Sequence, residues 1–114
     1  MKLSLLTFIA ASLLVGNSYA VTSDEFDIYY YRQPNFVDQA GSQHGTISRG
    51  QSAGRPKANM SHVQSIQAPE WLQVTIFSGY AYSGESFTTL GDAALIDPPF
   101  TVHSIKYKNT NEAD

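Results

Sequence analysis

After its first 20 residues, the chain consists mostly of short runs in which apolar and polar residues alternate. Residues 26–31 and 71–77 are rich in aromatic and β-branched side chains, and such alternating runs favour β-strands. No stretch keeps the 3.6-residue period of an amphipathic helix, and residues 92–96 allow one helical turn at most. Shorter strand-like runs cover residues 63–67, 85–90 and 101–108. The sequence therefore predicts an all-β fold.

The segment 38–61 departs from this alternation. It is polar and holds four of the eight glycines of the chain. Because polar, glycine-rich segments usually run over the surface, we predict short strands and a long surface loop here. The triplet Ala68-Pro69-Glu70 predicts a turn between two halves of the chain, and Ser83-Gly84 predicts a second turn.

Residues 1–20 have the three parts of a secretory signal peptide. Lys2 supplies the positive charge, residues 3–15 are nearly all apolar, and small residues precede the expected cleavage site after Ala20. The apolar run is too short for a membrane span, and no other long apolar run follows. The prediction is a secreted, soluble protein whose domain comprises residues 21–114, with a polar tail at 109–114.

Charge and cysteine content exclude several classes of protein. The net charge of the chain is −3, and loss of Lys2 makes the mature form one unit more negative. A net acidic domain lacks the clustered lysines and arginines that nucleic acids require. The chain has no cysteine, which excludes disulfide scaffolds, cysteine-based metal sites and cysteine nucleophiles. Its aromatic residues must therefore build the core.

One pattern occurs twice along the chain: an aromatic residue, four intervening residues, a second aromatic residue and, later, Ser-Ile in a strand-like run. Two copies of about forty residues, 26–68 and 71–108, predict a double Greek-key β-sandwich. The residues that meet the pattern are Tyr31, Phe36 and Ser65 in the first copy and Phe77, Tyr82 and Ser104 in the second.

This pattern, with a glycine two residues after the second aromatic, resembles the Greek-key motif of the βγ-crystallin superfamily. The second copy matches it in full because Gly84 supplies the glycine. In the first copy Asp38 stands at that place, although aspartate tolerates a left-handed backbone better than most residues. Trp71 lies where such domains often begin their second motif. The resemblance implies that each aromatic pair packs across a folded hairpin and that Ser65 and Ser104 bind the hairpins to later strands.

The resemblance also raises the question of calcium. The family binds it through two Asn/Asp residues, two arbitrary residues, Ser/Thr and Ser, because a hard cation needs several oxygen ligands. Residues 60–65 (Met-Ser-His-Val-Gln-Ser) and 99–104 (Pro-Phe-Thr-Val-His-Ser) occupy these places here. Neither window contains an acidic pair. We therefore expect no cofactor and no tight calcium site.

Enzymatic and zinc chemistry find little support in the sequence. His44, His62 and His103 are its only imidazoles, and no His-x-His or His-x-x-x-His spacing joins two of them. We expect His103 on the exposed face of the last strand, with Ser104 pointing inward. No Gly-x-Ser-x-Gly motif is present. The prediction is a protein without catalytic activity.

Three functions remain open for such a domain. The first is a structural or binding role outside the cell, with an extracellular protein or a cell-surface component as partner. The second is a secreted antimicrobial toxin or proteinase inhibitor of the same fold, although the relatives of that kind resemble disulfide-rich proteins. The third is a calcium-binding crystallin-like domain. Asn59 lies in an Asn-Met-Ser sequon and is a candidate glycosylation site in a eukaryotic host.

We predict that the mature protein begins near Val21 and is found outside the cytoplasm, because residues 1–20 carry the complete leader pattern. Intact-mass measurement of the secreted protein should show a chain that lacks about the first 20 residues. Recovery of the full-length chain from the cytosol would contradict this prediction.

Overall fold

Nine strands make up the described part of the protein. The computed structural model describes residues 22–113, so the predicted leader at residues 1–20 lies outside the described residues. Within this range the fold is all-β, as predicted, and no helix could span a membrane. The strands are β3 (Ser23–Gln33), β4 (Val37–Ser48), β5 (Ser52–Arg55), β6 (Met60–Val63), β7 (Ser65–Gln67), β8 (Leu72–Phe77), β9 (Ser86–Leu90), β10 (Phe100–Val102) and β11 (Ser104–Asn109).

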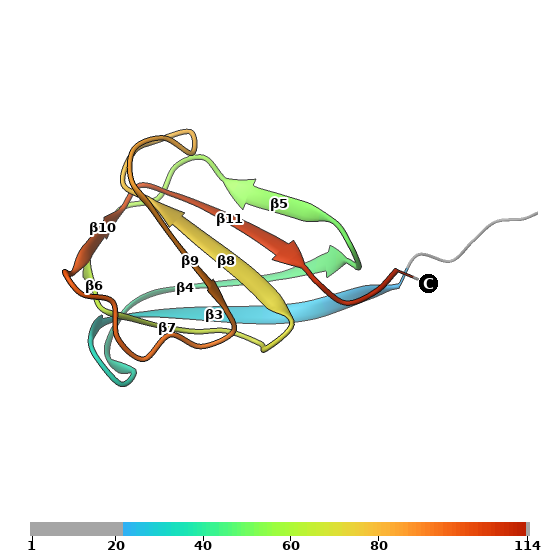
Figure 1. Cartoon of the computed structure of the whole chain (residues 1–114), viewed down its shortest axis with the longest axis horizontal. Helices are drawn as coiled ribbons and strands as arrows, with labels where there is room; N and C mark the ends of the chain where they lie inside the picture. Colours follow the sequence, from blue (N-terminus) through green and yellow to red (C-terminus); the bar gives the residue numbers. More distant parts are fainter. Residues whose placement is uncertain (1–21, 114) are drawn as a thin grey trace, which may run out of the picture.

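The strands form three antiparallel sheets (Figure 1). The first has the order β4-β3-β7, the second has the order β5-β11-β8-β9, and the third is the pair β10-β6. Strand β5 belongs to the first half of the chain but pairs with β11, the last strand. In the opposite direction, Ala93 from the second half forms an isolated bridge with Ile66 in β7. Each half of the chain therefore contributes backbone to the sheet of the other half.

Alternation along the strands directs one set of side chains into a single core. In β8, Leu72, Val74 and Ile76 are buried whereas Gln73 is exposed, as expected when successive side chains point to opposite faces. Residues from both larger sheets belong to one apolar cluster. The ring of Phe26 in β3 lies 5.0 Å from that of Tyr107 in β11. This aromatic contact joins the two larger sheets in a protein that has no disulfide. The expectation that aromatic residues build the core is wrong for most of it, because Phe26 and Tyr30 are the only aromatic residues among the buried core residues described and the others are aliphatic.

The long surface loop predicted within residues 38–61 is wrong for most of that segment. Strand β4 is 12 residues long and pairs with β3 from Val37 to Ser48. Two of its glycines lie where large side chains cover the backbone. A Cβ atom at Gly45 would be 2.9 Å from the Phe26 ring, and one at Gly41 would be 2.7 Å from Met60 Sδ. These glycines are required by packing and do not mark a loop.

Two runs that were predicted as single strands are each divided by one residue. Gln64 separates β6 from β7, and His103 separates β10 from β11. At both residues the chain leaves the β10-β6 pair and enters a larger sheet, so its hydrogen-bond partner changes. Residues 92–96, for which the sequence allowed one helical turn at most, form no helix: Ala93 pairs with Ile66, and the Ile96 amide donates to the Gln64 carbonyl at 2.7 Å.

Asp24 joins the beginning of the first described strand to the end of the last one. Its carboxylate accepts hydrogen bonds from Arg49 Nε at 3.1 Å, Asn109 Nδ2 at 2.9 Å and Asn111 Nδ2 at 3.1 Å. Asn109, predicted to begin a polar tail, is fully buried and also donates to the Ile47 carbonyl at 2.9 Å. Because Arg49, Asn109 and Asn111 all stabilise its charged form, the pKa of Asp24 falls to about 2.

We predict that Asp24→Asn destabilises the protein near neutral pH and much less in acid. A carboxyl group with a lowered folded pKa stabilises the fold above its unfolded value of 3.8, and this contribution disappears as the pH falls through about 2. Urea unfolding at about pH 6 and about pH 2.5 measures the free energy of unfolding, and the difference in this quantity between wild type and variant should be smaller at the lower pH. A difference that is the same at both pH values would contradict this role.

Candidate functional site

The first aromatic pair and its serine meet in one folded hairpin between β3 and β4. The rings of Tyr31 and Phe36 lie edge to face, with their centroids 5.9 Å apart. The buried hydroxyl of Ser65 accepts a hydrogen bond from the Phe36 amide at 3.0 Å and donates one to the Gln33 carbonyl at 2.6 Å. The start of β7 therefore holds the hairpin in place.

The second set of residues forms the same arrangement between β8 and β9. Phe77 and Tyr82 also lie edge to face, with centroids 5.8 Å apart. Ser104 Oγ accepts from the Tyr82 amide at 2.9 Å and donates to the Gly79 carbonyl at 2.6 Å. The two hairpins are thus built from equivalent contacts, one in each half of the chain.

The backbone of the two hairpins is left-handed at matching positions. Asp38 has a φ of 65°, so the first hairpin keeps the conformation that the glycine provides in the second. Asp38 stands where the motif has glycine, and it takes the left-handed conformation that aspartate tolerates better than most residues. The positive φ values are 60°, 64° and 65° at Asn35, Phe36 and Asp38, and 54°, 62° and 81° at Ala81, Tyr82 and Gly84.

Trp71 immediately precedes β8 and packs partly buried against the core. Its carbonyl accepts hydrogen bonds from Thr110 N at 3.0 Å and from Thr110 Oγ1 at 2.6 Å. Trp71 therefore fastens the chain just after β11 to the beginning of the second half.

The two windows considered for calcium lie side by side, because β6 pairs with β10. The pairing joins Val63 to Phe100 and Met60 to Val102, so apolar side chains occupy the contact. Within residues 22–113, no three His, Asp or Glu side chains are grouped closely enough to hold a metal ion. Of the oxygen-bearing side chains in these windows, Ser61 and Thr101 are exposed.

The three histidines occupy separate places. His44 in β4 contacts Asp27 through Nδ1 at 2.8 Å, and His62 in β6 is exposed. His103, predicted on the exposed face of the last strand, is instead half-buried between β10 and β11. Its Nδ1 donates to the Ser78 carbonyl at 2.7 Å, and its ring lies 4.7 Å from that of Tyr80. This contact turns His103 toward the second hairpin.

Asn59 is exposed immediately before β6. Together with Lys57, Ala58 and Tyr80 it lines an open hollow beside the second hairpin. The amide is accessible for glycosylation at this place, and modification of Asn59 stays a prediction.

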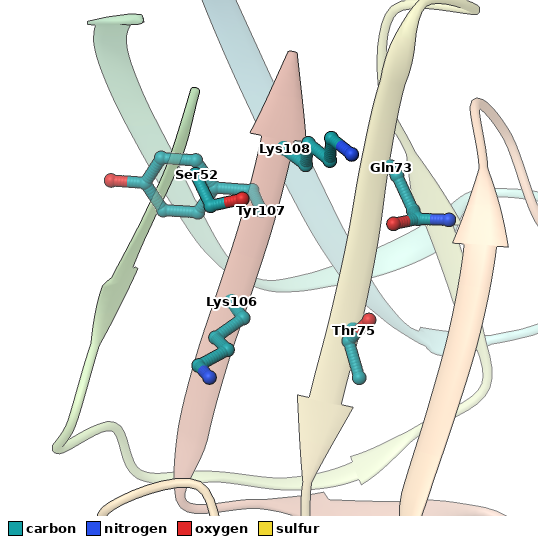
Figure 2. Close-up of a pocket in the computed structure, with 6 residues that line it drawn as sticks. All are labelled: Ser52, Gln73, Thr75, Lys106, Tyr107 and Lys108. Atoms are coloured by element: carbon teal, nitrogen blue, oxygen red, sulfur yellow. The ribbon is translucent and has the colours of Figure 1, made fainter. Parts of the chain in front are cut away.

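Sequence reasoning missed a shallow hollow on the β5-β11-β8-β9 sheet. Figure 2 shows Lys106 and Lys108 on β11 beside Thr75 and Gln73 on β8. The hollow has a volume of about 150 Å³, and Ser52 of β5 completes its rim. Lys106-Tyr107-Lys108 is the signal that could have found it, because residues i and i+2 of a strand point to the same face.

We predict that Gly84→Val lowers the free energy of unfolding by about 1–3 kcal/mol and that Asp38→Val lowers it less. Both residues have a left-handed backbone, but a Cβ atom at Gly84 would also collide with Ser78 Oγ, whereas Asp38 already carries one. Denaturant titrations of the two variants measure the difference. Asp38→Gly is the control and should leave stability unchanged or raise it, because glycine has no left-handed penalty. Equal losses for the two valine variants would contradict the prediction, because the collision at Gly84 would then add nothing to the cost of a left-handed backbone.

Comparisons with known proteins give no relative for this chain: no family model, no curated protein and no solved structure matches it. The fold and the surfaces described above are therefore the basis for any proposal about its function.

Proposed function

We propose that this chain is a secreted, non-enzymatic protein of βγ-crystallin type, with two Greek-key motifs and a structural or binding role outside the cell. The observation that carries the proposal is the repeated hairpin. In both copies a buried serine hydroxyl bonds to the amide of the second aromatic residue and to a carbonyl earlier in the turn. Two hairpins with the same contacts and the same backbone conformation are difficult to obtain without an internal repeat.

The strand order supports the same proposal. The second sheet has the order β9-β8-β11-β5, and the first has the order β4-β3-β7 followed by the bridge to Ala93. These orders match when β8 is equated with β3, β9 with β4, β11 with β7, and β5 with the backbone at Ala93. In each sheet the outer position beside the serine-bearing strand is filled from the other half of the chain. This exchange is the topology expected of two interlocked Greek keys.

A role in binding or structure fits the chemistry of the described residues better than catalysis. The hydroxyls of Ser65 and Ser104 are both used by the backbone, and Nδ1 of His103 is bonded to a carbonyl. A proteinase inhibitor needs an exposed, rigid loop, and the longest segment predicted as a loop does not supply it, because β4 and β5 take up much of residues 41–60. The surface of the β5-β11-β8-β9 sheet has a hollow lined by two lysines and neutral polar groups, which could bind a ligand.

The proposal can be tested with the purified mature protein added to a culture of the source cells. We expect it to bind to the cell-surface or matrix fraction and to be released by salt, with no effect on growth and no inhibition of proteinases. Serum albumin serves as the control for non-specific retention. Growth arrest or proteinase inhibition at micromolar concentration would support the antagonist function instead and overturn the proposal.

We predict that calcium binds weakly, with a dissociation constant on the order of 10⁻³ M or higher. The adjoining windows 60–65 and 99–104 supply neutral hydroxyls and carbonyls, which do not offset the dehydration of a divalent cation as two carboxylates do. Titration calorimetry measures the affinity directly, and the melting temperature should change little when calcium is added. A dissociation constant in the low micromolar range would revive the calcium-binding function.

A further inference from the structure

Within the strands of the two larger sheets, the charged residues are unevenly distributed. Strands β5, β8, β9 and β11 contain no acidic residue, although the chain as a whole has a net charge of −3. The sheet formed by these four strands carries Arg55, Lys106 and Lys108. By contrast, the acidic residues Asp24, Glu25, Asp27 and Asp38 lie on β3 and β4 together with the single cation Arg32. The strands of one sheet in this acidic protein therefore carry positive charges only.

The strand register places the two lysines on the same exposed face. Lys108 pairs with Gln73 on one side and with Ser52 on the other, and Lys106 pairs with Thr75 in the next row. Figure 2 shows the ammonium group of Lys108 extending from β11 toward β8 and Gln73, whereas that of Lys106 points back along β11 toward the beginning of the strand. The intervening residue, Tyr107, packs against Phe26 through its ring.

Neutral polar groups fill the space around the lysines. Thr75 Oγ1 lies 2.9 Å from Thr88 Oγ1 on β9, and the Gln73 amide and Ser52 hydroxyl are exposed beside Lys108. The ammonium of Lys106 lies 4.8 Å from the centroid of the Tyr82 ring, a cation–π contact that helps to position it. Neither lysine forms an ion pair with another residue in the range 22–113. Both charges are therefore available to a ligand.

We propose that this face, formed by Ser52, Gln73, Thr75, Lys106 and Lys108, binds an acidic polysaccharide that carries carboxylate or sulfate groups. The inference rests on the binding role proposed above and names its ligand class. An anionic substituent enters the hollow between the lysines, while sugar hydroxyls bond to the amide and hydroxyl groups around it. A volume of about 150 Å³ is well below that of ordinary small-molecule pockets. It suits one charged group of a longer chain that lies across the sheet.

The same residues fit other occupants less well. A protein partner, including the acidic sheet of a second copy, needs aromatic or aliphatic anchors at the centre of its contact. Of the large hydrophobic residues exposed within 22–113, only Leu90 belongs to this sheet, at its edge strand β9. Single-stranded nucleic acids need stacking platforms in addition to positive charge, and the face of Tyr82 is already covered by Lys106. A hydroxyl-rich, anionic polymer matches both features of the surface.

The experiment measures binding of the mature chain, residues 21–114, to heparin, polygalacturonate and dextran as sulfated, carboxylated and neutral probes. We expect binding to both acidic polymers and none to dextran, with an affinity that falls several-fold between about 50 mM and about 200 mM salt. Lys106→Gln/Lys108→Gln should lower the affinity about tenfold or more. Lys106→Arg/Lys108→Arg should retain it because the charge is kept.

Arg32→Gln/Lys57→Gln is the matched control, because it removes the same charge away from this face. Its affinity for the acidic polymers should stay within about twofold of that of the wild type, because this variant changes only the long-range electrostatic attraction. Equal losses of affinity in the two glutamine variants would overturn the proposal. Tighter binding to anionic phospholipid vesicles or to single-stranded DNA would also overturn it. So would a dimer that forms at low salt and that the lysine-to-glutamine variant abolishes. Thermal unfolding verifies that each variant is folded. A folded, secreted protein that binds none of the acidic polymers refutes this ligand and leaves the crystallin-type proposal standing.

Discussion

A buried serine hydroxyl that holds a left-handed hairpin is the interaction on which the rest of this structure depends. Ser65 and Ser104 are fully buried, and each hydroxyl both accepts and donates a hydrogen bond to the backbone of its hairpin. Left-handed residues other than glycine each cost about 1–2 kcal/mol; three occur in the first hairpin and two in the second. An unpaired buried polar group costs about 1–3 kcal/mol. The strained turn and the buried serine therefore stabilise each other, and together they set the direction of the following strand.

With the hairpins in place, the two larger sheets can share one core without any covalent link. Phe26 and Tyr107 contact across the sheets, and the alternating residues of β3 and β8 fill the space between them. A small domain without disulfides gains most of its stability from such apolar burial. The Asp24 network adds a polar connection between the start of β3 and the end of β11, where fraying of a sheet would otherwise begin.

The same alternation that buries the core also decides the character of the outer surface. Inward positions of β11 are occupied by Ile105 and Tyr107, so Lys106 and Lys108 must face outward. No acidic residue lies in the neighbouring strands to neutralise them. Positive charges gathered on one face of a sheet attract anions from solution even when the whole protein is acidic. Dissolved salt screens the repulsion from acidic residues that lie farther away. The proposed ligand follows from this local charge and from the neutral hydroxyls beside it.

The sequence alone determined the all-β class and the strand at residues 72–77, because these depend on short-range periodicity. The aromatic and serine residues that meet in each hairpin were implied by the resemblance to a known motif. Only the tertiary structure decided which glycines lie under side chains and which strands pair. Gly41 and Gly45 looked like loop residues, yet they lie under Met60 and Phe26, which are distant in sequence. Asp38 stands where the motif has glycine, and its φ of 65° occurs in a hairpin that Ser65 holds from a strand almost thirty residues later. The pairing of β5 with β11, which places Ser52 beside Lys108, joins segments about fifty residues apart, and no local pattern specifies such a partner.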